Sequence, residues 1–220
     1  MSTLIKSSLA RKYAMALSGL FLVFFLLQHF TINITSVFSE DVFNQLSHFM
    51  GNNPLVQFVL QPVLIFGVVF HFVMGFVLEI QNRKARANKY SANNGAANSS
   101  WMSRNMIISG AVVLSFLGLH FYDFWIPEMN YKYVEVLPEN PTRYFEETVH
   151  KFENPLRVGL YVLSFGFLAL HLMHGFSSSF QSLGANNKYT RAIKGFTTAF
   201  AIGIPLGFVF IALFHHLTAF

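Results

Sequence analysis

Five long apolar stretches dominate the pattern of hydrophobic and polar positions along this chain. Polar or charged segments separate the stretches, which cover residues 14–34, 55–80, 106–126, 156–176 and 196–214. A helix rises about 1.5 Å per residue, so each stretch is long enough to cross about 30 Å of hydrocarbon. The first is too long for a signal-peptide core, and no A-x-A cleavage signal follows it. The pattern predicts an all-α membrane bundle of five transmembrane helices, forming a single domain over residues 1–220.

Composition agrees with a membrane protein and excludes several other classes. Hydrophobic residues make up 53% of the 220 residues and charged residues only 11%, about half the charged share of a typical soluble domain. The net charge is +5, but no basic groove that would bind nucleic acid is visible. The chain has no cysteine, which excludes thiolate-bound iron–sulfur clusters and the covalent attachment of c-type haem within it. Any such centre must belong to a partner.

Charged side chains are distributed unevenly between the two ends of the predicted spans. The N-terminal tail, the connection after the second span and the segment before the fifth carry eleven basic residues and one acidic residue, Glu79. The opposite connections carry nine acidic and four basic residues. The positive-inside rule therefore predicts a cytoplasmic N-terminus and a C-terminus outside. We expect residues 88–100 to form a flexible cytoplasmic linker, and the long outer connection at 127–154 to end in a short interfacial helix.

Histidines are the most informative polar residues of the chain. Five of the nine lie within predicted spans: His29, His71, His120, His171 and His174. An ionisable side chain at membrane depth is costly and usually faces the bundle interior in a binding or transfer role, although a single one can simply be hydrogen-bonded to a neighbouring helix. Here, four separate predicted helices each carry a histidine within the span, which favours a shared role. The other four are expected to be hydrated or interfacial: His48, His150, His215 and His216.

The span histidines fall at two depths. His29 and His120 lie about one turn from the predicted outer ends of their helices. His71 and His171 follow a proline at the outer end of their helices by seventeen and sixteen residues, which is about 25 Å. Two facing pairs, His29 with His120 and His71 with His171, are what two bis-histidine haems need, because each iron takes one neutral imidazole on either side of the macrocycle.

Small residues accompany these histidines. Glycine follows each inner histidine by four residues, at Gly75 and Gly175, and would leave room for a flat porphyrin. The first and third spans share a second pattern, in which Ser-Gly is followed by His-Phe after an equal number of residues. It occurs in "SGLFLVFFLLQHF" (18–30) and "SGAVVLSFLGLHF" (109–121). Eleven residues are close to three turns, so each Ser-Gly pair lies about 16 Å inward on the face of its histidine. We predict clearance for the inner haem there, although small residues are also common wherever membrane helices touch.

The chain resembles the cytochrome b membrane subunit of succinate:quinone oxidoreductases, the succinate dehydrogenase and fumarate reductase complexes, and in particular the single-chain, five-helix, two-haem type. The likeness covers nearly the whole chain and rests on "LLQHF" (26–30), "FNQLSHFM" (43–50), "FHFVMG" (70–75), "GLHF" (118–121) and "LHLMHGFSSSFQSLG" (170–184). The resemblance implies two haem b groups. His29 and His120 would ligate the outer, distal haem, and His71 and His171 the inner, proximal one. His174, one turn from His171, is the alternative fourth ligand.

The resemblance also implies an electron-transfer role in the bacterial cytoplasmic membrane. A flavoprotein subunit with FAD would oxidise succinate or reduce fumarate, and an iron–sulfur subunit would meet this chain at its cytoplasmic face. The haems would connect these partners to a membrane quinone, most often menaquinone in this type. The chain would not act on succinate by itself but would host the quinone reaction. His48, on the outer connection between the first two spans, is a candidate protonatable group beside an outer quinone site.

Two other functions are compatible with the sequence. A haem-free proton-coupled transporter would need broken helices and paired acids near the midplane. Pro62 and Pro205 are the clear mid-helix breakers, and no Asp or Glu is expected inside a span, because Glu79 and Asp123 are taken as span ends. A stand-alone transmembrane haem reductase, acting on ascorbate or ferric ion, would bind haem but no flavoprotein. The visible spectrum separates the transporter from the other two functions, and co-purification with a flavin-bearing subunit separates those two from each other.

Overall fold

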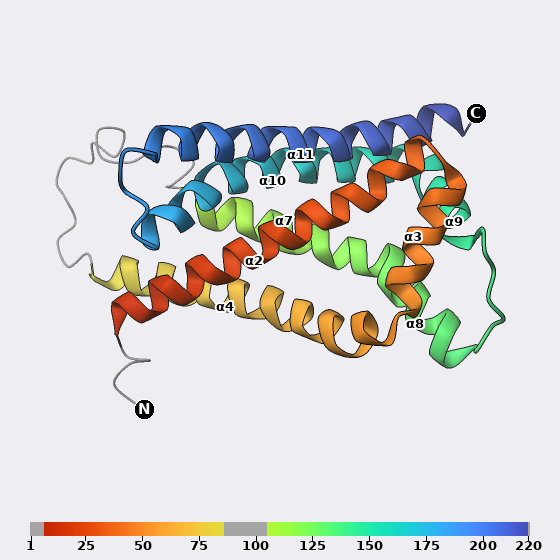
Figure 1. Cartoon of the computed structure of the whole chain (residues 1–220), viewed down its shortest axis with the longest axis horizontal. Helices are drawn as coiled ribbons and strands as arrows, with labels where there is room; N and C mark the ends of the chain where they lie inside the picture. Colours follow the sequence, from red (N-terminus) through yellow and green to blue (C-terminus); the bar gives the residue numbers. More distant parts are fainter. Residues whose placement is uncertain (1–6, 86–104, 220) are drawn as a thin grey trace.

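The computed structural model describes residues 7–85 and 105–219, and this part of the chain is helical, without strands. The predicted linker at 88–100 and four of the basic residues counted above lie outside the described residues: Lys6, Arg86, Lys89 and Arg104. Five helical segments of this part of the chain are long and apolar enough to cross a membrane, as many as the predicted spans. They run along the long axis of the molecule (Figure 1) and keep large apolar side chains exposed, among them Phe24, Phe66 and Leu206, as suits contact with hydrocarbon.

Each of the five long segments has defined bounds. The first is α2 (Ser8–Ile34), and the second joins a π-helical turn, η2 (Val56–Leu60), to α4 (Gln61–Ala85). The third combines α7 (Met106–His120), η3 (Phe121–Trp125), α8 (Ile126–Met129) and η4 (Asn130–Val134). The fourth and fifth are α10 (Pro155–Ser182) and α11 (Thr190–Thr218). All five extend beyond the apolar stretches, because a helix ends where its backbone hydrogen bonds lose partners, whereas hydropathy falls as soon as polar side chains begin.

The third segment corrects the predicted span at 106–126. Helical structure continues to Val134, so Asp123 lies within the segment and does not mark its end. The π-helical turn η3 ends two residues before Pro127, which has no N–H to donate to a regular α-helical ladder. A change of hydrogen-bonding pattern at this point lets the helix continue past a residue that the sequence presents as a helix breaker.

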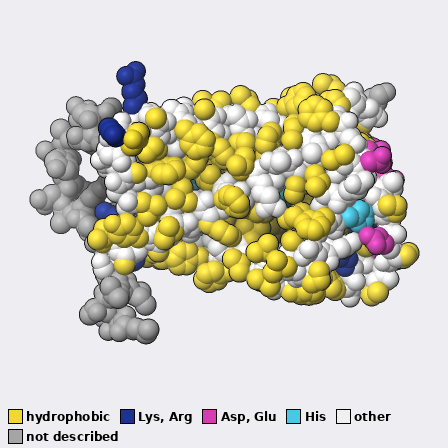
Figure 2. All heavy atoms as spheres, viewed as in Figure 1, with side chains coloured by type: hydrophobic (Ala, Val, Ile, Leu, Met, Phe, Trp, Pro, Cys, Tyr) yellow, Lys and Arg dark blue, Asp and Glu magenta, His cyan; other side chains and the backbone are white. Residues whose placement is uncertain are grey.

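Two shorter amphipathic helices cross one end of the bundle (Figure 1): α3 (Glu40–Asn52), after the single turn η1 (Thr35–Val37), and α9 (Arg143–Glu153). The helix α9 confirms the short helix predicted at the end of the outer connection, whereas α3 was not predicted. On the face shown in Figure 2, acidic side chains lie at this end, apolar side chains cover the middle, and Lys and Arg lie mainly at the opposite end. The charge asymmetry of the sequence is therefore an asymmetry between the two ends of the molecule.

Four of the long helices form a ring, and the fifth packs against its outside. The helix α2 contacts α4 and α10, α7 contacts α10 and more lightly α4, and α11 packs along α10 and against α2. Buried apolar side chains concentrate between α9, α10 and α11: Phe152, Val158, Tyr161, Phe165, Ile204, Phe208, Ile211 and Ala212. In this arrangement α2 faces α7, and α4 faces α10, across the two diagonals of the ring.

Candidate bis-histidine sites

His29 of α2 and His120 of α7 face each other across one diagonal of the ring. Their ring centres are 5.7 Å apart and their planes are nearly perpendicular, at 85°. One turn earlier in each helix, Phe25 stacks on His29 and Phe116 stacks on His120, at 5.5 and 5.8 Å between ring centres. The Nδ1 atom of His120 is buried and has no hydrogen-bond partner within the described residues. The two histidines that we paired by depth are neighbours in space.

His71 of α4 and His171 of α10 form the second pair, across the other diagonal. Their ring centres are 6.3 Å apart and their planes meet at 71°. Hydroxyl groups contact both rings: the Oγ of Ser18 lies 2.9 Å from the Nδ1 of His71, and the Oγ of Ser109 lies 3.3 Å from the Nδ1 of His171. Both serines belong to the Ser-Gly pairs of the sequence, which therefore lie at the inner level, as predicted, but in direct contact with the imidazoles.

The glycines of the Ser-Gly pairs let α2 and α7 approach the inner histidines closely. A Cβ atom on Gly19 would lie 3.4 Å from the Cε1 of His71, and a Cβ on Gly110 would lie 3.5 Å from the Cε1 of His171. These are ordinary contact distances, so any side chain longer than a methyl group would press on the rings. Small residues at these positions keep each serine hydroxyl within reach of its histidine.

The space predicted beside Gly75 and Gly175 is filled by methionine side chains. A Cβ atom on Gly75 would lie 3.6 Å from the Cε of Met15, and one on Gly175 would lie 3.0 Å from the Cε of Met106. Methionine is unbranched and has three rotatable side-chain bonds, so it fills such gaps and yields to a bulkier occupant more easily than other apolar residues do. A flat group beside these glycines would have to displace the two methionine methyl groups.

His174 lies one turn from His171 on α10 and is half-buried. Its Nε2 atom lies 3.4 Å from the Oγ of Ser178 on the same helix. Within residues 7–85 and 105–219, no ring contact joins it to another histidine, whereas His171 faces His71. The geometry therefore favours His171 over His174 as the partner of His71.

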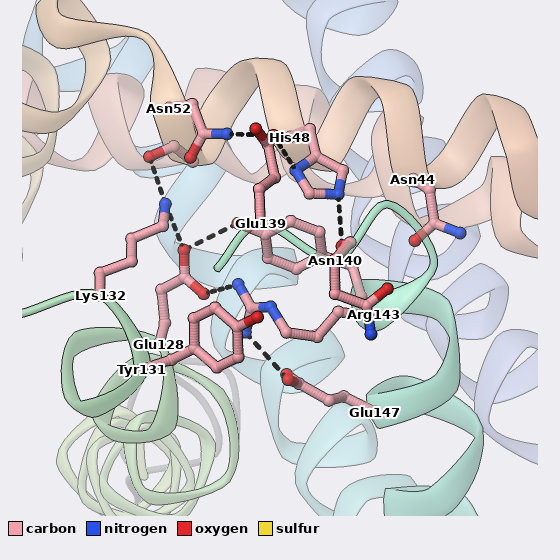
Figure 3. Close-up of polar contacts among 12 residues, drawn as sticks. Asn44, His48, Asn52, Glu128, Tyr131, Lys132, Glu139, Asn140, Arg143 and Glu147 are labelled. Carbon is pink, nitrogen blue, oxygen red and sulfur yellow. Dashed lines mark hydrogen bonds and ion pairs between the residues drawn. The ribbon is translucent and has the colours of Figure 1, made fainter. Parts of the chain in front are cut away.

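His48 lies on α3, and its contacts join this helix to the outer connection (Figure 3). Its Nδ1 lies 3.2 Å from the carboxylate of Glu139, and its Nε2 lies 3.1 Å from the carbonyl oxygen of Asn140. The imidazole also packs edge-on against Tyr144, and the side chain is only 17% exposed. These contacts explain the position of His48 as a structural bridge. Its role beside a quinone stays a prediction.

A network of charged and hydroxyl groups surrounds this bridge, and the sequence analysis missed it. Glu128 pairs with Lys132 at 2.6 Å, pairs with Arg143, and accepts a hydrogen bond of 2.7 Å from Tyr144, while Arg143 also pairs with Glu147 at 2.9 Å (Figure 3). Burial alone would lower the pKa of Arg143, but the hydrogen bonds and charges of the two glutamates raise it above its ordinary value. The sequence feature that could have predicted part of this network is the i,i+4 spacing of Glu128 with Lys132 and of Arg143 with Glu147.

Two polar residues that the sequence placed at the membrane surface or in water are buried. Asp123 is 1% exposed; it accepts a hydrogen bond of 2.9 Å from Tyr161 and lies 3.2 Å from the guanidinium of Arg157. His215, expected to be hydrated or interfacial, is also 1% exposed, with its Nε2 2.8 Å from the Oγ of Ser36. Both expectations were wrong, because these groups find polar partners on neighbouring helices and do not need water.

The two histidine pairs suit a metal ion whose remaining ligands belong to a bound macrocycle and not to the protein. Imidazoles bonded to opposite sides of one ion by bonds of about 2 Å have ring centres about 6 Å apart, close to the 5.7 and 6.3 Å observed. Within the described ranges, no three His, Cys, Asp or Glu side chains form a group that could hold a bare ion. A haem needs only two protein ligands because the macrocycle supplies the rest, so the donor set fits a bis-histidine haem at each level.

Comparison of the chain with protein-family models, with curated proteins and with solved structures finds no match. Over the described residues, fold and site define a helical protein with five candidate membrane spans and two facing histidine pairs inside a four-helix ring.

Proposed function

We propose that this chain is the cytochrome b membrane subunit of a succinate:quinone oxidoreductase of the succinate dehydrogenase or fumarate reductase type. It would carry electrons between an iron–sulfur subunit and a membrane quinone through two b-type haems. The observation that supports this most strongly is the presence of one facing imidazole pair on each diagonal of the ring. Two centres in series across the bundle suit electron transfer between a soluble partner at one end and a quinone in the membrane.

The residues of the chain would ligate, orient and shield these centres. Haem, when bound, supplies the one-electron redox chemistry. His29 and His120 would hold the outer haem, and His71 and His171 the inner one. Each imidazole must present an unprotonated nitrogen to iron, which requires the neutral ring. The stacked rings of Phe25 and Phe116 restrict rotation of the outer histidines.

The charge asymmetry supports an orientation for the complex. We place the basic end in the bacterial cytoplasm by the positive-inside rule, where the iron–sulfur and flavoprotein subunits would dock. The described basic residues of that end are Arg11, Lys12, Arg83, Lys84, Lys188, Arg191 and Lys194. The end crossed by α3 and α9 would then face outside. His48 would border a quinone site there, with menaquinone as the expected quinone.

Purification in a mild detergent, with haem, flavin and iron quantified in one sample, tests the proposal. We expect two b-type haems per chain, a six-coordinate low-spin spectrum in both oxidation states, and co-purifying flavoprotein and iron–sulfur subunits. One haem per chain, or a high-spin ferric band in intact protein, would overturn the arrangement at two levels.

Two outcomes would favour the other functions. Haem without flavin or non-haem iron would indicate a stand-alone transmembrane haem reductase acting on ascorbate or ferric ion. A protein without haem would favour a proton-coupled transporter, for which the buried Asp123 would be the acid within the membrane.

A further inference from the structure

Ser18 and Ser109 make the same pair of contacts on two different helices. The Oγ of Ser18 lies 2.9 Å from the carbonyl oxygen of Met15, and the Oγ of Ser109 lies 3.0 Å from that of Met106, three residues earlier in each case. Each hydroxyl also lies within hydrogen-bond distance of the Nδ1 of an inner histidine, at 2.9 and 3.3 Å. The two contacts together determine which atom donates.

A serine hydroxyl has one proton and two lone pairs. A backbone carbonyl can only accept, and we take the proton of each serine to lie in the bond to Met15 or Met106. The contact with the imidazole then requires the Nδ1 atom to carry a proton and donate it to the serine oxygen. His71 and His171 are therefore held as the tautomer with a free lone pair on Nε2, the nitrogen that can bind a metal ion.

The outer histidines have no equivalent acceptor within the described residues. The amide nitrogen of Asn33 donates a hydrogen bond of 2.8 Å to the backbone carbonyl of His29 and lies 3.4 Å or more from either ring nitrogen. The Nδ1 of His120 is buried without a partner. Within the described residues, a serine hydroxyl therefore contacts the Nδ1 of each inner histidine and of neither outer histidine.

We propose that Ser18 and Ser109 are positioning residues of the inner haem, which hold both axial imidazoles in the metal-binding tautomer and strengthen their donation to iron. This inference rests on the proposed function, because it requires that His71 and His171 ligate a haem. A hydrogen bond from Nδ1–H makes the imidazole a more basic ligand, and a more basic ligand stabilises ferric iron relative to ferrous iron. The two serines therefore lower the reduction potential of the inner haem.

Redox titration of the two haems in the intact, detergent-purified complex tests this role. The variants are Ser18→Ala, Ser109→Ala and the double variant, with Ser115→Ala as the matched control. Ser115 lies on α7, is exposed, and donates to the carbonyl of Ala111 at 3.0 Å. We expect each single variant to raise the potential of the inner haem, the double variant to raise it further, and the outer potential to stay unchanged. Ser115→Ala should change neither potential.

Electron paramagnetic resonance of the oxidised complex gives a second measurement, since free rotation of the imidazoles would shift the low-spin signal of the inner haem. Wild-type haem content with unchanged inner potential and signal in both single variants would overturn the positioning role and leave the proposed function intact. A wild-type protein without haem would overturn both the positioning role of the serines and the proposed function. If a variant loses the inner haem and keeps the outer one, Ser→Thr at the same position decides: recovered haem supports the role of the hydroxyl, and continued loss contradicts it.

Discussion

The carboxylate of Asp123 lies 3.2 Å from the guanidinium of Arg157 and has no exposed surface, so an ion pair lies inside the bundle. Asp123 follows His120 by three residues, and its other carboxylate oxygen, Oδ2, accepts a hydrogen bond of 2.9 Å from Tyr161. The pair therefore ties η3 to α10 one turn beyond an outer histidine. A buried carboxylate is tolerated here because one oxygen accepts a hydrogen bond and the other faces a guanidinium.

Replacing Asp123 with Ala should destabilise the protein strongly. Removing one partner of a buried ion pair costs about 3–5 kcal/mol, and we expect the lower end because the Arg157 side chain is 28% exposed and can regain some hydration. Asp123→Asn, which can still accept a hydrogen bond from Tyr161, should cost less. Thermal unfolding in detergent measures the effect, with Glu153→Ala, at a side chain 47% exposed, as the control. Equal unfolding temperatures for Asp123→Ala and Glu153→Ala would contradict the importance of the buried pair.

The pairing of the histidines predicts which variants share a phenotype. His29→Ala and His120→Ala should each remove or convert the same haem, and His71→Ala and His171→Ala the other, because the rings of each pair face each other at 5.7 and 6.3 Å. Loss of one ligand opens a coordination position, so a high-spin signal at partial occupancy is an acceptable result. Haem quantification with low-temperature spectra checks this. A phenotype shared by His29→Ala and His71→Ala would refute the two levels.

His174→Ala should leave the inner haem in place. His174 contacts Ser178 on its own helix at 3.4 Å, whereas His171 faces His71. The measurement is the haem content and spectrum of His174→Ala beside His171→Ala. Loss of the inner haem from the first variant, with retention in the second, would transfer the ligand role to His174.

His48→Gln should slow succinate:quinone turnover by up to about 100-fold, the lower range of general acid–base contributions, with both haems and succinate-to-dye activity intact. The matched variant is Glu139→Gln, which removes the charge 3.2 Å from the imidazole and keeps the histidine. If His48 only holds the outer connection in place, His48→Gln and Glu139→Gln should change quinone turnover to the same extent. Unchanged quinone turnover of His48→Gln between about pH 6 and pH 8 would exclude the proton-transfer role.

The partly buried phenol of Tyr144 predicts a loss of stability in alkaline solution. Burial raises the pKa of Tyr144, and its hydrogen bond to Glu128 raises it further. The folded state therefore favours the protonated phenol, so this stabilisation is complete below the unfolded pKa of about 10 and is lost as pH rises through the folded value. From about pH 9 to about pH 11, the unfolding temperature should fall less in Tyr144→Phe than in wild type. Tyr133→Phe, at a residue 53% exposed, is the control and should follow wild type.

The fold was predictable at the level of elements but not of their limits. The apolar stretches predicted the number of long apolar helices among the described residues, and the end of the outer connection at 127–154 was correctly predicted as a short helix, α9. The extension of the third segment to Val134 was missed because a π-helical turn before Pro127 has no signal in hydropathy. The burial of His215 was missed because its partner, Ser36, is 179 residues away in the sequence.

The sequence by itself determined the five long apolar helices and the position of each histidine along its helix, because hydropathy and a fixed rise per residue are local properties of the chain. Only the tertiary structure decided which imidazoles face each other and which hydroxyl reaches each Nδ1. Ser18 and His71 are 53 residues apart, and Ser109 and His171 are 62 apart. Contacts over such separations depend on how each helix is rotated about its axis and on which neighbours it packs against, and the ring of α2, α4, α7 and α10 fixes both.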